Sequence, residues 1–225
     1  KHCSIMYKIK NSKELASLIN CINLNNMISE EEMEEYLDKV GELNFNSITI
    51  SPTYVSLAKE KLADSTTKIS TVVGFPLGFE TTEGKVAQAA KALEDGADEI
   101  EAVINLNHLK DHKYNLIHEE LSQLRELLGD KTLKVIVEMQ AIEDSEKASI
   151  AKVLEENKVD FIKTSTGFST AGATFADIEL FAKHVGPGVK IKAAGGISTL
   201  EDAEHFVALG ASRLGTSRII KLLKA

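Results

Sequence analysis

The chain has 225 residues, a length that suits one large domain, and 43% of them are hydrophobic, which is enough for a substantial core. Its formal net charge of −8 at pH 7 argues against broad electrostatic attraction to nucleic acid or to an anionic membrane surface. No run approaches the ~20 apolar residues of a membrane span, and no signal-peptide pattern opens the chain. The two cysteines, Cys3 and Cys21, match no metal-ligand spacing and no disulfide framework, so we expect a protein of the reducing cytoplasm.

Apolar runs of strand length alternate with longer segments of helical period. After an amphipathic segment at 12–18, the sequence predicts eight strands, at 18–22, 46–51, 68–73, 99–104, 133–138, 160–164, 189–193 and 213–215. Each strand is followed by a predicted helix, and these helices lie, in the same order, at 30–40, 52–62, 82–94, 116–128, 144–156, 175–184, 199–209 and 217–223. Ser29 is the expected N-cap of the helix at 30–40, and Pro52 is expected to start the next helix. Gly41, Gly96 and Gly210 each follow a predicted helix, where a left-handed residue is favoured.

Strands that alternate with helices call for parallel βαβ units. Eight such units in a chain of this length predict an α/β fold of the (β/α)₈ TIM-barrel type, as a single domain over 1–225 with a short N-terminal helical segment. A doubly wound open sheet is the alternative, although eight units would be many for it. No linker, low-complexity stretch or charge block suggests a domain boundary.

Charged residues alternate along the middle strands. In a barrel of this type the active site lies at the C-terminal ends of the strands, and side chains alternate between the interior and the outer face. Placing the charged faces inward brings together Glu101, Lys134, Glu138, Lys163 and Lys192. A strand-end lysine that points into solvent is the alternative for any one of them. It is a poor explanation for all five, because helices cover the outer face of the strands.

Lys163 ends an apolar run and is followed by hydroxyls and a glycine in Thr164-Ser165-Thr166-Gly167. A lysine amine becomes a nucleophile when burial and a neighbouring ammonium disfavour its charged form, and Lys192 lies one strand away. A neutral amine can form a Schiff base with a carbonyl substrate. Glu101 is then the expected proton shuttle, acting through water. Lys134 and Thr164 are further candidates for contacts with the substrate.

Glycines and hydroxyls that follow the last strands suit an anion. Gly195-Gly196 ends the seventh strand, Thr216-Ser217 follows the eighth, and Gly167 could close the same pocket. Exposed backbone N–H groups at a glycine turn or a helix N-terminus bind phosphate, and the loops after strands 7 and 8 form a recurrent phosphate site in this fold. A plain strand-to-helix turn remains the alternative.

The remaining candidate residues are expected to have structural roles. The six histidines lie at the terminus, in loops or on helices without ligand spacing, at positions 2, 108, 112, 118, 184 and 205, so we expect no metal and no cofactor. Cys21 lies in a strand and is expected to pack. The glutamates at 30–35 are expected to form a solvated helix face.

Six motifs together resemble the 2-deoxyribose-5-phosphate aldolase family over nearly the full length of the chain. They are Thr71-Val-Val-Gly-Phe-Pro-Leu-Gly78, Gly96-Ala-Asp-Glu-Ile100, Leu133-Lys-Val-Ile-Val-Glu138, Lys163-Thr-Ser-Thr-Gly-Phe168, Lys192-Ala-Ala-Gly-Gly-Ile197 and Gly215-Thr-Ser217. The resemblance implies a metal-independent class I aldolase, a carbon–carbon lyase of deoxyribonucleotide catabolism that reversibly joins acetaldehyde to D-glyceraldehyde 3-phosphate.

The same resemblance implies roles for particular residues. Lys163 would be the Schiff-base lysine, Lys192 the lysine that perturbs it, and Gly167, Gly195, Gly196 and Ser217 would hold the phosphate. It also suggests a homo-oligomer, either a dimer or a tetramer, and a small phosphorylated sugar or aldehyde as the only partner, with no nucleic acid and no membrane.

The chain departs from the family pattern at three places. Glu101 stands where the family has an aspartate, Asn20-Cys21-Ile22 replaces Asp-His-Thr on the first strand, and Met139-Gln140 replaces the Thr-Gly after Glu138. Two alternatives therefore stay open beside the deoxyribose-phosphate activity. One is the same lysine chemistry on another phosphorylated aldehyde, and the other is a phosphosugar-binding barrel that has lost turnover.

Overall fold

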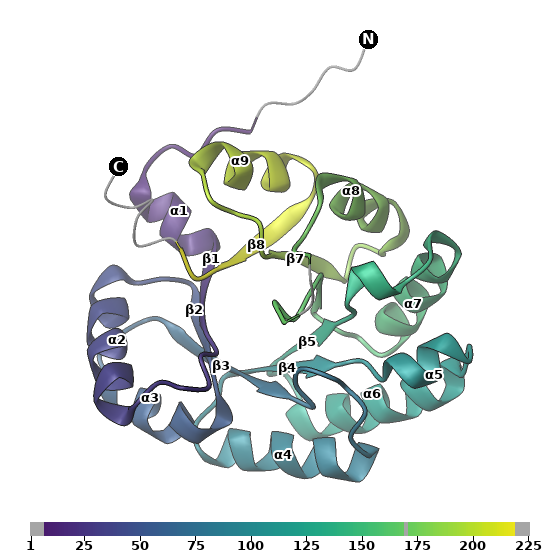
Figure 1. Ribbon diagram of the computed structural model, residues 1–225, viewed down its shortest axis with the longest axis horizontal. Helices are drawn as coiled ribbons and strands as arrows, with labels where there is room; N and C mark the ends of the chain where they lie inside the picture. Colours follow the sequence, from purple (N-terminus) through teal and green to yellow (C-terminus); the bar gives the residue numbers. More distant parts are fainter. Residues whose placement is uncertain (1–6, 169–170, 219–225) are drawn as a thin grey trace.

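The computed structural model describes residues 7–168 and 171–218. In this part of the chain eight parallel strands form a closed barrel in sequence order, with β1 paired to β8 (Figure 1). The strands are β1 (Ile19–Asn23), β2 (Ser47–Ile50), β3 (Lys68–Val73), β4 (Glu99–Val103), β5 (Thr132–Ile136), β6 (Phe161–Lys163), β7 (Lys190–Ala194) and β8 (Ala211–Thr216). The predicted (β/α)₈ barrel is confirmed, and the open-sheet alternative is wrong.

Helices surround this barrel as an outer ring (Figure 1). They are α1 (Ser12–Leu18), α2 (Glu30–Leu43), α3 (Val55–Lys61), α4 (Thr82–Glu94), α5 (Leu106–Lys110), α6 (Tyr114–Leu128), α7 (Asp144–Glu156), α8 (Phe175–His184) and α9 (Leu200–Ala208), with short 3₁₀ turns η1 (Pro52–Tyr54) and η2 (Met139–Ala141). The sequence did not predict α5 or η2. The helix predicted at 217–223 lies, beyond Arg218, outside the described residues.

Local sequence signals explain most helix boundaries. Ser29 caps α2 with a complete capping box, because its side chain accepts from the backbone of Glu32 while the Glu32 carboxylate accepts from the backbone of Ser29. The prediction for Gly41 is wrong: α2 continues to Leu43, and Asn44 takes the left-handed conformation at its end, with φ of 48°. The buried residues of α2 are Met33, Leu37 and Val40, so the helix extends to Leu43 past its buried face.

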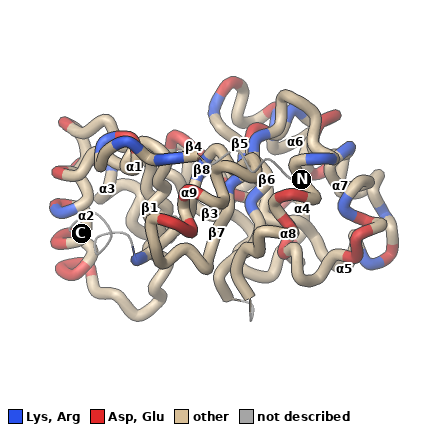
Figure 2. The backbone as a smooth tube through the Cα atoms, turned by 90° about the horizontal axis from the view of Figure 1, so that it is seen from above, with Lys and Arg blue, Asp and Glu red and all other residues tan. Residues whose placement is uncertain are grey.

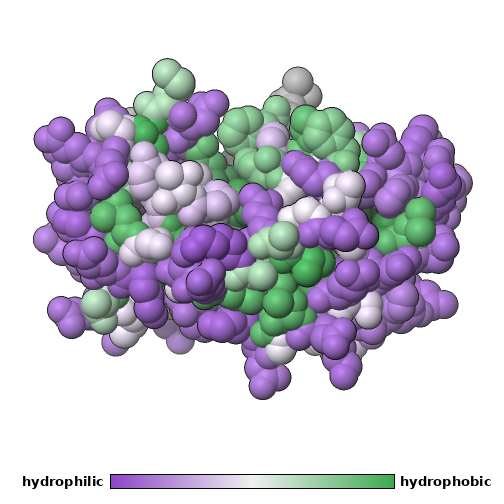
Figure 3. All heavy atoms as spheres, turned by 90° about the horizontal axis from the view of Figure 1, so that it is seen from below, coloured by the Kyte–Doolittle hydropathy of each residue, from purple (hydrophilic) through white to green (hydrophobic). Residues whose placement is uncertain are grey.

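The core lies between the barrel and its helices. The strands are almost entirely buried, as expected where helices cover their outer faces, and aliphatic side chains dominate the core cluster. Charged residues of both signs lie along the outer helices and loops (Figure 2). The surface seen from below is mainly hydrophilic, with separate apolar patches (Figure 3).

Candidate active site

Four charged side chains meet inside the barrel, one each from β4, β5, β6 and β7. Glu101 is the register partner of Lys134, and Lys163 is the register partner of Lys192. The Glu101 carboxylate lies 2.8 Å from Nζ of Lys163, 2.6 Å from Nζ of Lys192 and 3.1 Å from Nζ of Lys134. At most 1% of any of these side chains is exposed. The structure thus brings together four of the five residues that strand alternation placed in the interior.

Glu138 does not join this cluster, so the prediction of its inward convergence is wrong. Strand β5 ends at Ile136, and Glu138 adopts a left-handed backbone with φ of 47°, which breaks the alternation of side chains. Its carboxylate instead accepts hydrogen bonds from the backbone N–H and the hydroxyl of Thr166, at 2.7 and 2.9 Å. It therefore belongs to the loop after β6.

The protonation of the cluster follows from burial and from the surplus of cations. Burial on its own would raise the pKa of Glu101, but the charges of Lys163, Lys192 and Lys134 hold the pKa of that carboxyl well below its ordinary value. Burial lowers the pKa of Lys192 well below its ordinary value, and the charges of Lys163 and Lys134 lower it further, whereas Glu101 opposes them. The geometry thus favours an ionised carboxylate beside a lysine that readily becomes a neutral amine.

A polar wall on β1 and β2 completes this cluster, and the sequence did not predict its role. The Thr49 hydroxyl lies 3.1 Å from Glu101 Oε1 and 2.8 Å from Oδ1 of Asn20. Asn20 donates to Ser47 at 2.7 Å and accepts a hydrogen bond from Nζ of Lys192. Extending the inward alternation from β4–β7 to β1 and β2 would have found these residues.

A second ion pair lies next to the cluster, formed by Glu99 and Arg213. Arg213 Nη1 contacts both carboxylate oxygens of Glu99 at 2.9 Å, and its guanidinium lies 4.4 Å from the ring centroid of Phe161. Burial acts to raise the pKa of Glu99, but Lys134 and Arg213 hold it below its ordinary value. Lys134 bridges the two carboxylates, since its amine lies 2.6 Å from Glu99 and 3.1 Å from Glu101.

Above the cluster lies a cavity of about 550 Å³, built mainly from the segments that follow β1, β6, β7 and β8. Its lining residues are Ile22, Asn23, Leu24, Asn25, Lys163, Ser165, Thr166, Gly167, Phe168, Ala194, Gly195, Gly196, Ile197, Ser198, Gly215, Thr216, Ser217 and Arg218. Lys163 is the member of the buried cluster that reaches this lining. The structure therefore places its amine between the carboxylate below and the cavity above.

The residues predicted to hold phosphate all line this cavity: Gly167, Gly195, Gly196, Thr216 and Ser217. The glycine at 195 is required by its surroundings, because φ is 82° and a Cβ would approach the Cα of Gly172 to 2.9 Å. The Gly195 N–H donates to the Gly215 carbonyl at 3.3 Å, so the candidate donors at this edge are the Gly196 N–H and the Ser217 hydroxyl.

Two other predicted substrate contacts are placed elsewhere. Lys134 is fully buried in its ionic bridge and does not line the cavity. The Thr164 hydroxyl is also buried, where it donates to the carbonyl of Ala194 at 3.2 Å and accepts from its N–H at 3.1 Å. Thr164 thus fastens β6 to β7, and Lys134 positions Glu101.

Arg218 lines the cavity, although the sequence assigned it to a helix. Its backbone N–H donates to the Thr216 hydroxyl at 3.1 Å. Among the lining residues, which include no carboxylate, the cations are Lys163 and Arg218. A local cation of this kind is what an acidic chain needs in order to bind an anionic ligand.

Among the residues that the structure describes, no group of three or more His, Cys, Asp or Glu side chains is arranged to hold a metal ion. In the same part of the chain, no helix is both long enough and apolar enough to cross a membrane.

Comparisons with known proteins agree with this geometry. Residues 16–217 match the model of the DeoC/LacD family of aldolases. The chain is 45% identical over 214 residues to the deoxyribose-phosphate aldolase of Clostridium botulinum (strain Alaska E43 / Type E3), covering 95% of this chain and 96% of that protein. It is 50% identical over 193 residues to the deoxyribose-phosphate aldolase of Streptococcus agalactiae serotype Ia, covering 86% of each.

Solved structures give the same result. The chain superposes with a TM-score of 0.88 on an aldolase called QR15, at 35% identity, covering 93% of this chain and 94% of that one. It superposes with a TM-score of 0.87 on the tetrameric deoxyribose phosphate aldolase of Aeropyrum pernix, at 29% identity, covering 96% of this chain and 92% of that one.

Proposed function

Because the chain belongs to the DeoC/LacD family of aldolases, we propose that it reversibly cleaves 2-deoxy-D-ribose 5-phosphate to acetaldehyde and D-glyceraldehyde 3-phosphate. The observation that carries the proposal is the position of Lys163. Lys163 lines the cavity, and its amine lies 2.8 Å from a buried carboxylate. A lysine in this position can bond covalently to a carbonyl while an acid–base group remains within reach.

The reaction begins when the neutral amine of Lys163 attacks the C1 aldehyde of the open-chain sugar. Loss of water then gives an iminium ion. The C2–C3 bond breaks as a base takes the proton of the C3 hydroxyl, and the electron pair of that bond moves into the iminium to form an enamine. D-Glyceraldehyde 3-phosphate leaves, C2 is protonated, and water hydrolyses the resulting imine to release acetaldehyde and the free lysine.

Glu101 and Lys192 are the proposed acid–base pair for these proton transfers. The two groups lie 2.6 Å apart, the pKa of the Glu101 carboxyl is held low by the neighbouring cations, and burial lowers the pKa of the Lys192 amine. A neutral Lys192 can accept a proton and an ionised Glu101 can stabilise the ammonium that forms. Because neither group lines the cavity, a water molecule or the Lys163 nitrogen would relay protons to the substrate.

The phosphate is proposed to lie at the opposite edge of the cavity from the buried cluster. Gly196 offers a backbone N–H group and Ser217 a hydroxyl there, Gly195 forms the tight turn beside them, Gly167 lines the same cavity, and Arg218 adds a positive charge. This arrangement orients the sugar with its aldehyde toward Lys163.

A second candidate substrate is favoured by one residue. Ile22 lines the cavity at a position where the resemblance implies a threonine hydroxyl, so another phosphorylated aldehyde could be the preferred acceptor. Comparing kcat/KM for acetaldehyde addition to D-glyceraldehyde 3-phosphate and to other phosphorylated aldehydes decides between the two substrates.

Three further properties are proposed: the domain organisation, the oligomeric state and the compartment. The barrel is proposed to act as a single domain, and the tetrameric relative from Aeropyrum pernix supports a homo-oligomer, which light scattering after size exclusion would measure. The buried free thiol of Cys21 is consistent with a reducing cytoplasm as the site of action.

The aldolase proposal is tested by borohydride reduction in the presence of acetaldehyde. We expect a stable ethyl adduct, confined to the peptide that carries Lys163. The Lys163→Arg variant keeps the charge but should give no adduct and no turnover, whereas Lys68→Arg, an exchange at an exposed strand residue, should behave like the parent protein. Absence of an adduct in the parent protein would overturn the proposal.

A further inference from the structure

The carboxylate of Glu138 is buried but takes no part in the proposed reaction. We infer that Glu138 is a positioning residue, which acts through Thr166 to hold the turn 166–168 in the shape that receives the substrate phosphate. The inference rests on the proposed function, because it assigns the phosphate to this side of the cavity.

The backbone of Glu138 is held in an unusual conformation. Its φ and ψ are 47° and 68°, a left-handed region that is costly for a residue with a side chain. Two backbone hydrogen bonds keep this segment beside β6, one from Val137 N–H to the Lys163 carbonyl at 3.1 Å and one from Met139 N–H to the Thr164 carbonyl at 2.9 Å. The left-handed residue between them aims its side chain at the loop that follows β6.

That side chain binds one residue with both of its oxygens. Oε1 accepts from the Thr166 backbone N–H at 2.7 Å, and Oε2 accepts from the Thr166 hydroxyl at 2.9 Å. Only 9% of Glu138 and 5% of Thr166 is exposed. Within residues 7–168 and 171–218 the carboxylate forms no salt bridge, so Thr166 provides the hydrogen bonds that compensate its burial.

Thr166 links the Glu138 carboxylate to the residues that line the cavity. Its hydroxyl donates to Glu138 and also accepts from the backbone N–H of Phe168 at 3.1 Å, which closes a turn around Gly167. Gly167 has a positive φ of 83°, so the orientation of its peptide groups depends on how the turn is closed. Residues 165–168 all line the cavity. Because the N–H groups of Thr166 and Phe168 are bonded within this arrangement, the carboxylate sets the orientation of the Gly167 N–H, which is the group that the turn can offer to an anion.

The test combines substitutions on both sides of the contact. In Glu138→Gln and in Thr166→Val, KM for 2-deoxyribose 5-phosphate should rise by about tenfold, the effect of losing a hydrogen bond to a charged group. KM for unphosphorylated 2-deoxyribose and kcat should change much less. Thr166→Ser, which keeps the backbone N–H and a hydroxyl, should retain the parent values. Glu126→Gln removes a charge from the exposed face of α6 and is the matched control.

Binding of inorganic phosphate, measured by calorimetry, gives a readout that does not need turnover. We expect about tenfold weaker binding in Glu138→Gln and Thr166→Val than in Thr166→Ser. If Glu138→Gln does not fold, the Val and Ser variants of Thr166 decide the question by themselves. Equal phosphate affinity in those two variants, or no binding by the parent protein, would overturn the inference. Failure of borohydride trapping alone would instead count against the aldolase proposal.

Discussion

Lys163 and Lys192 are register partners on adjacent strands, and their amines donate to opposite oxygens of one carboxylate. That carboxylate, Glu101, accepts from Lys163 through Oε2 and from Lys192 through Oε1. With Lys134 added, three lysine amines surround one carboxylate in a site where at most 1% of each side chain is exposed. The excess positive charge disfavours the ammonium form, and the pKa of Lys192, which burial and its lysine neighbours lower, reflects this.

The neutral amide of Asn20 contributes to that balance, and Asn20→Asp tests it. A carboxylate beside Nζ of Lys192 would favour the ammonium form and so raise the pKa of Lys192 above that of the parent protein. Because the neutral amine is the form that accepts a proton, activity rises as pH increases through this pKa. The acidic limb of the kcat/KM profile should therefore move to higher pH. The control Asn115→Asp adds the same charge on exposed α6, and an equal shift there would contradict this explanation.

Glu101→Asp tests whether the glutamate side chain fits this site. The parent carboxylate lies 2.8 Å from Lys163 and 2.6 Å from Lys192, so removing a methylene would withdraw it by about 1 Å from at least one of the amines. A displacement of that size lowers kcat by about a hundredfold when a catalytic group is involved. Steady-state assays with matched borohydride trapping would show whether the loss lies in imine formation. Activity equal to or above that of the parent would show that the shorter side chain suits the site as well.

The Glu99–Arg213 pair should contribute mainly to stability. Replacing Arg213 by Met leaves a buried carboxylate with Lys134 as its remaining charged partner, and we expect the free energy of unfolding to fall by about 3–5 kcal/mol. Urea unfolding measures this change. The exposed Lys68→Met exchange should cost far less, and a similar loss in both variants would mean that Arg213 contributes nothing specific.

Arg218 should determine preference for a phosphorylated substrate. It is one of the two cations that line the cavity, so Arg218→Ser should lower kcat/KM for 2-deoxyribose 5-phosphate by about tenfold. This is the effect expected from the loss of one charge-assisted hydrogen bond. Activity on unphosphorylated 2-deoxyribose should be retained. Competition by inorganic phosphate should weaken in parallel, and a uniform loss on both substrates would argue for a structural effect of the residue.

The barrel could be predicted from the sequence because its signals are local and repeat along the chain. Each buried strand is a short apolar run, and each helix carries an amphipathic period and often a cap such as Ser29. Two local features were missed for physical reasons. The short helix α5 is too brief to show a period, and α2 continues through Gly41 to Leu43, followed by Asn44, which takes the left-handed conformation that the sequence placed at the glycine.

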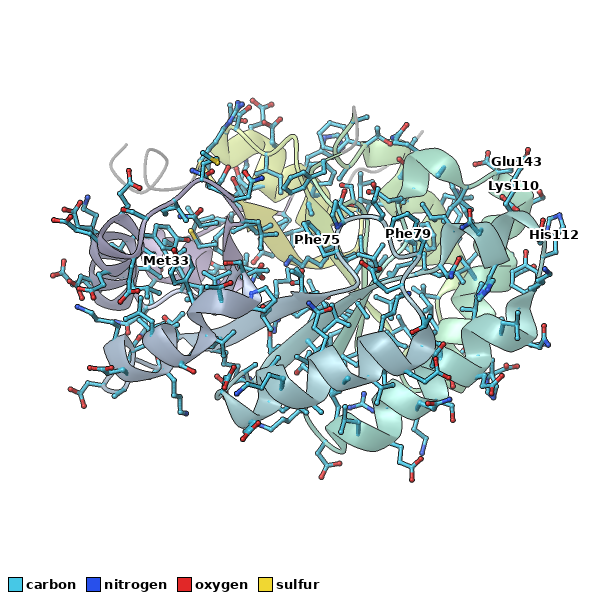
Figure 4. The ribbon with its side chains drawn as sticks, turned by 60° about the horizontal axis from the view of Figure 1, so that its bottom comes forward. Met33, Phe75, Phe79, Lys110, His112 and Glu143 are labelled. Atoms are coloured by element: carbon cyan, nitrogen blue, oxygen red, sulfur yellow. The ribbon has the colours of Figure 1, made fainter. Side chains whose placement is uncertain are left out.

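The buried charged cluster of the site could also be predicted, since strand alternation alone places Glu101, Lys163 and Lys192 on one interior surface. The alternation of side chains between the interior and the outer face fails at Glu138 because its backbone is left-handed. No sequence pattern predicts that backbone conformation. The contact between Glu99 and Arg213 joins β4 to β8 across the barrel, at a separation of 114 residues, which no local pattern can reveal. Phe75 and Phe79 lie on the loop after β3 (Figure 4), and the Phe75 ring packs edge-on against Phe168 of the cavity lining, with ring centroids 5.3 Å apart. This contact joins segments far apart in the chain, so no local pattern predicts it.

The two oxygens of Glu101 have separate sets of partners: Oε1 is bound by Lys192, Lys134, Thr49 and Ser70, and Oε2 by Lys163. When the Lys163 nitrogen becomes an imine, only the Oε2 contact has to change, while the four donors on Oε1 hold the carboxylate still. The surroundings of the reacting nitrogen therefore keep their arrangement from the free amine through the covalent intermediate and back. Little solvent or side-chain reorganisation is then needed at each step, which is the condition under which fixed charges lower a barrier most.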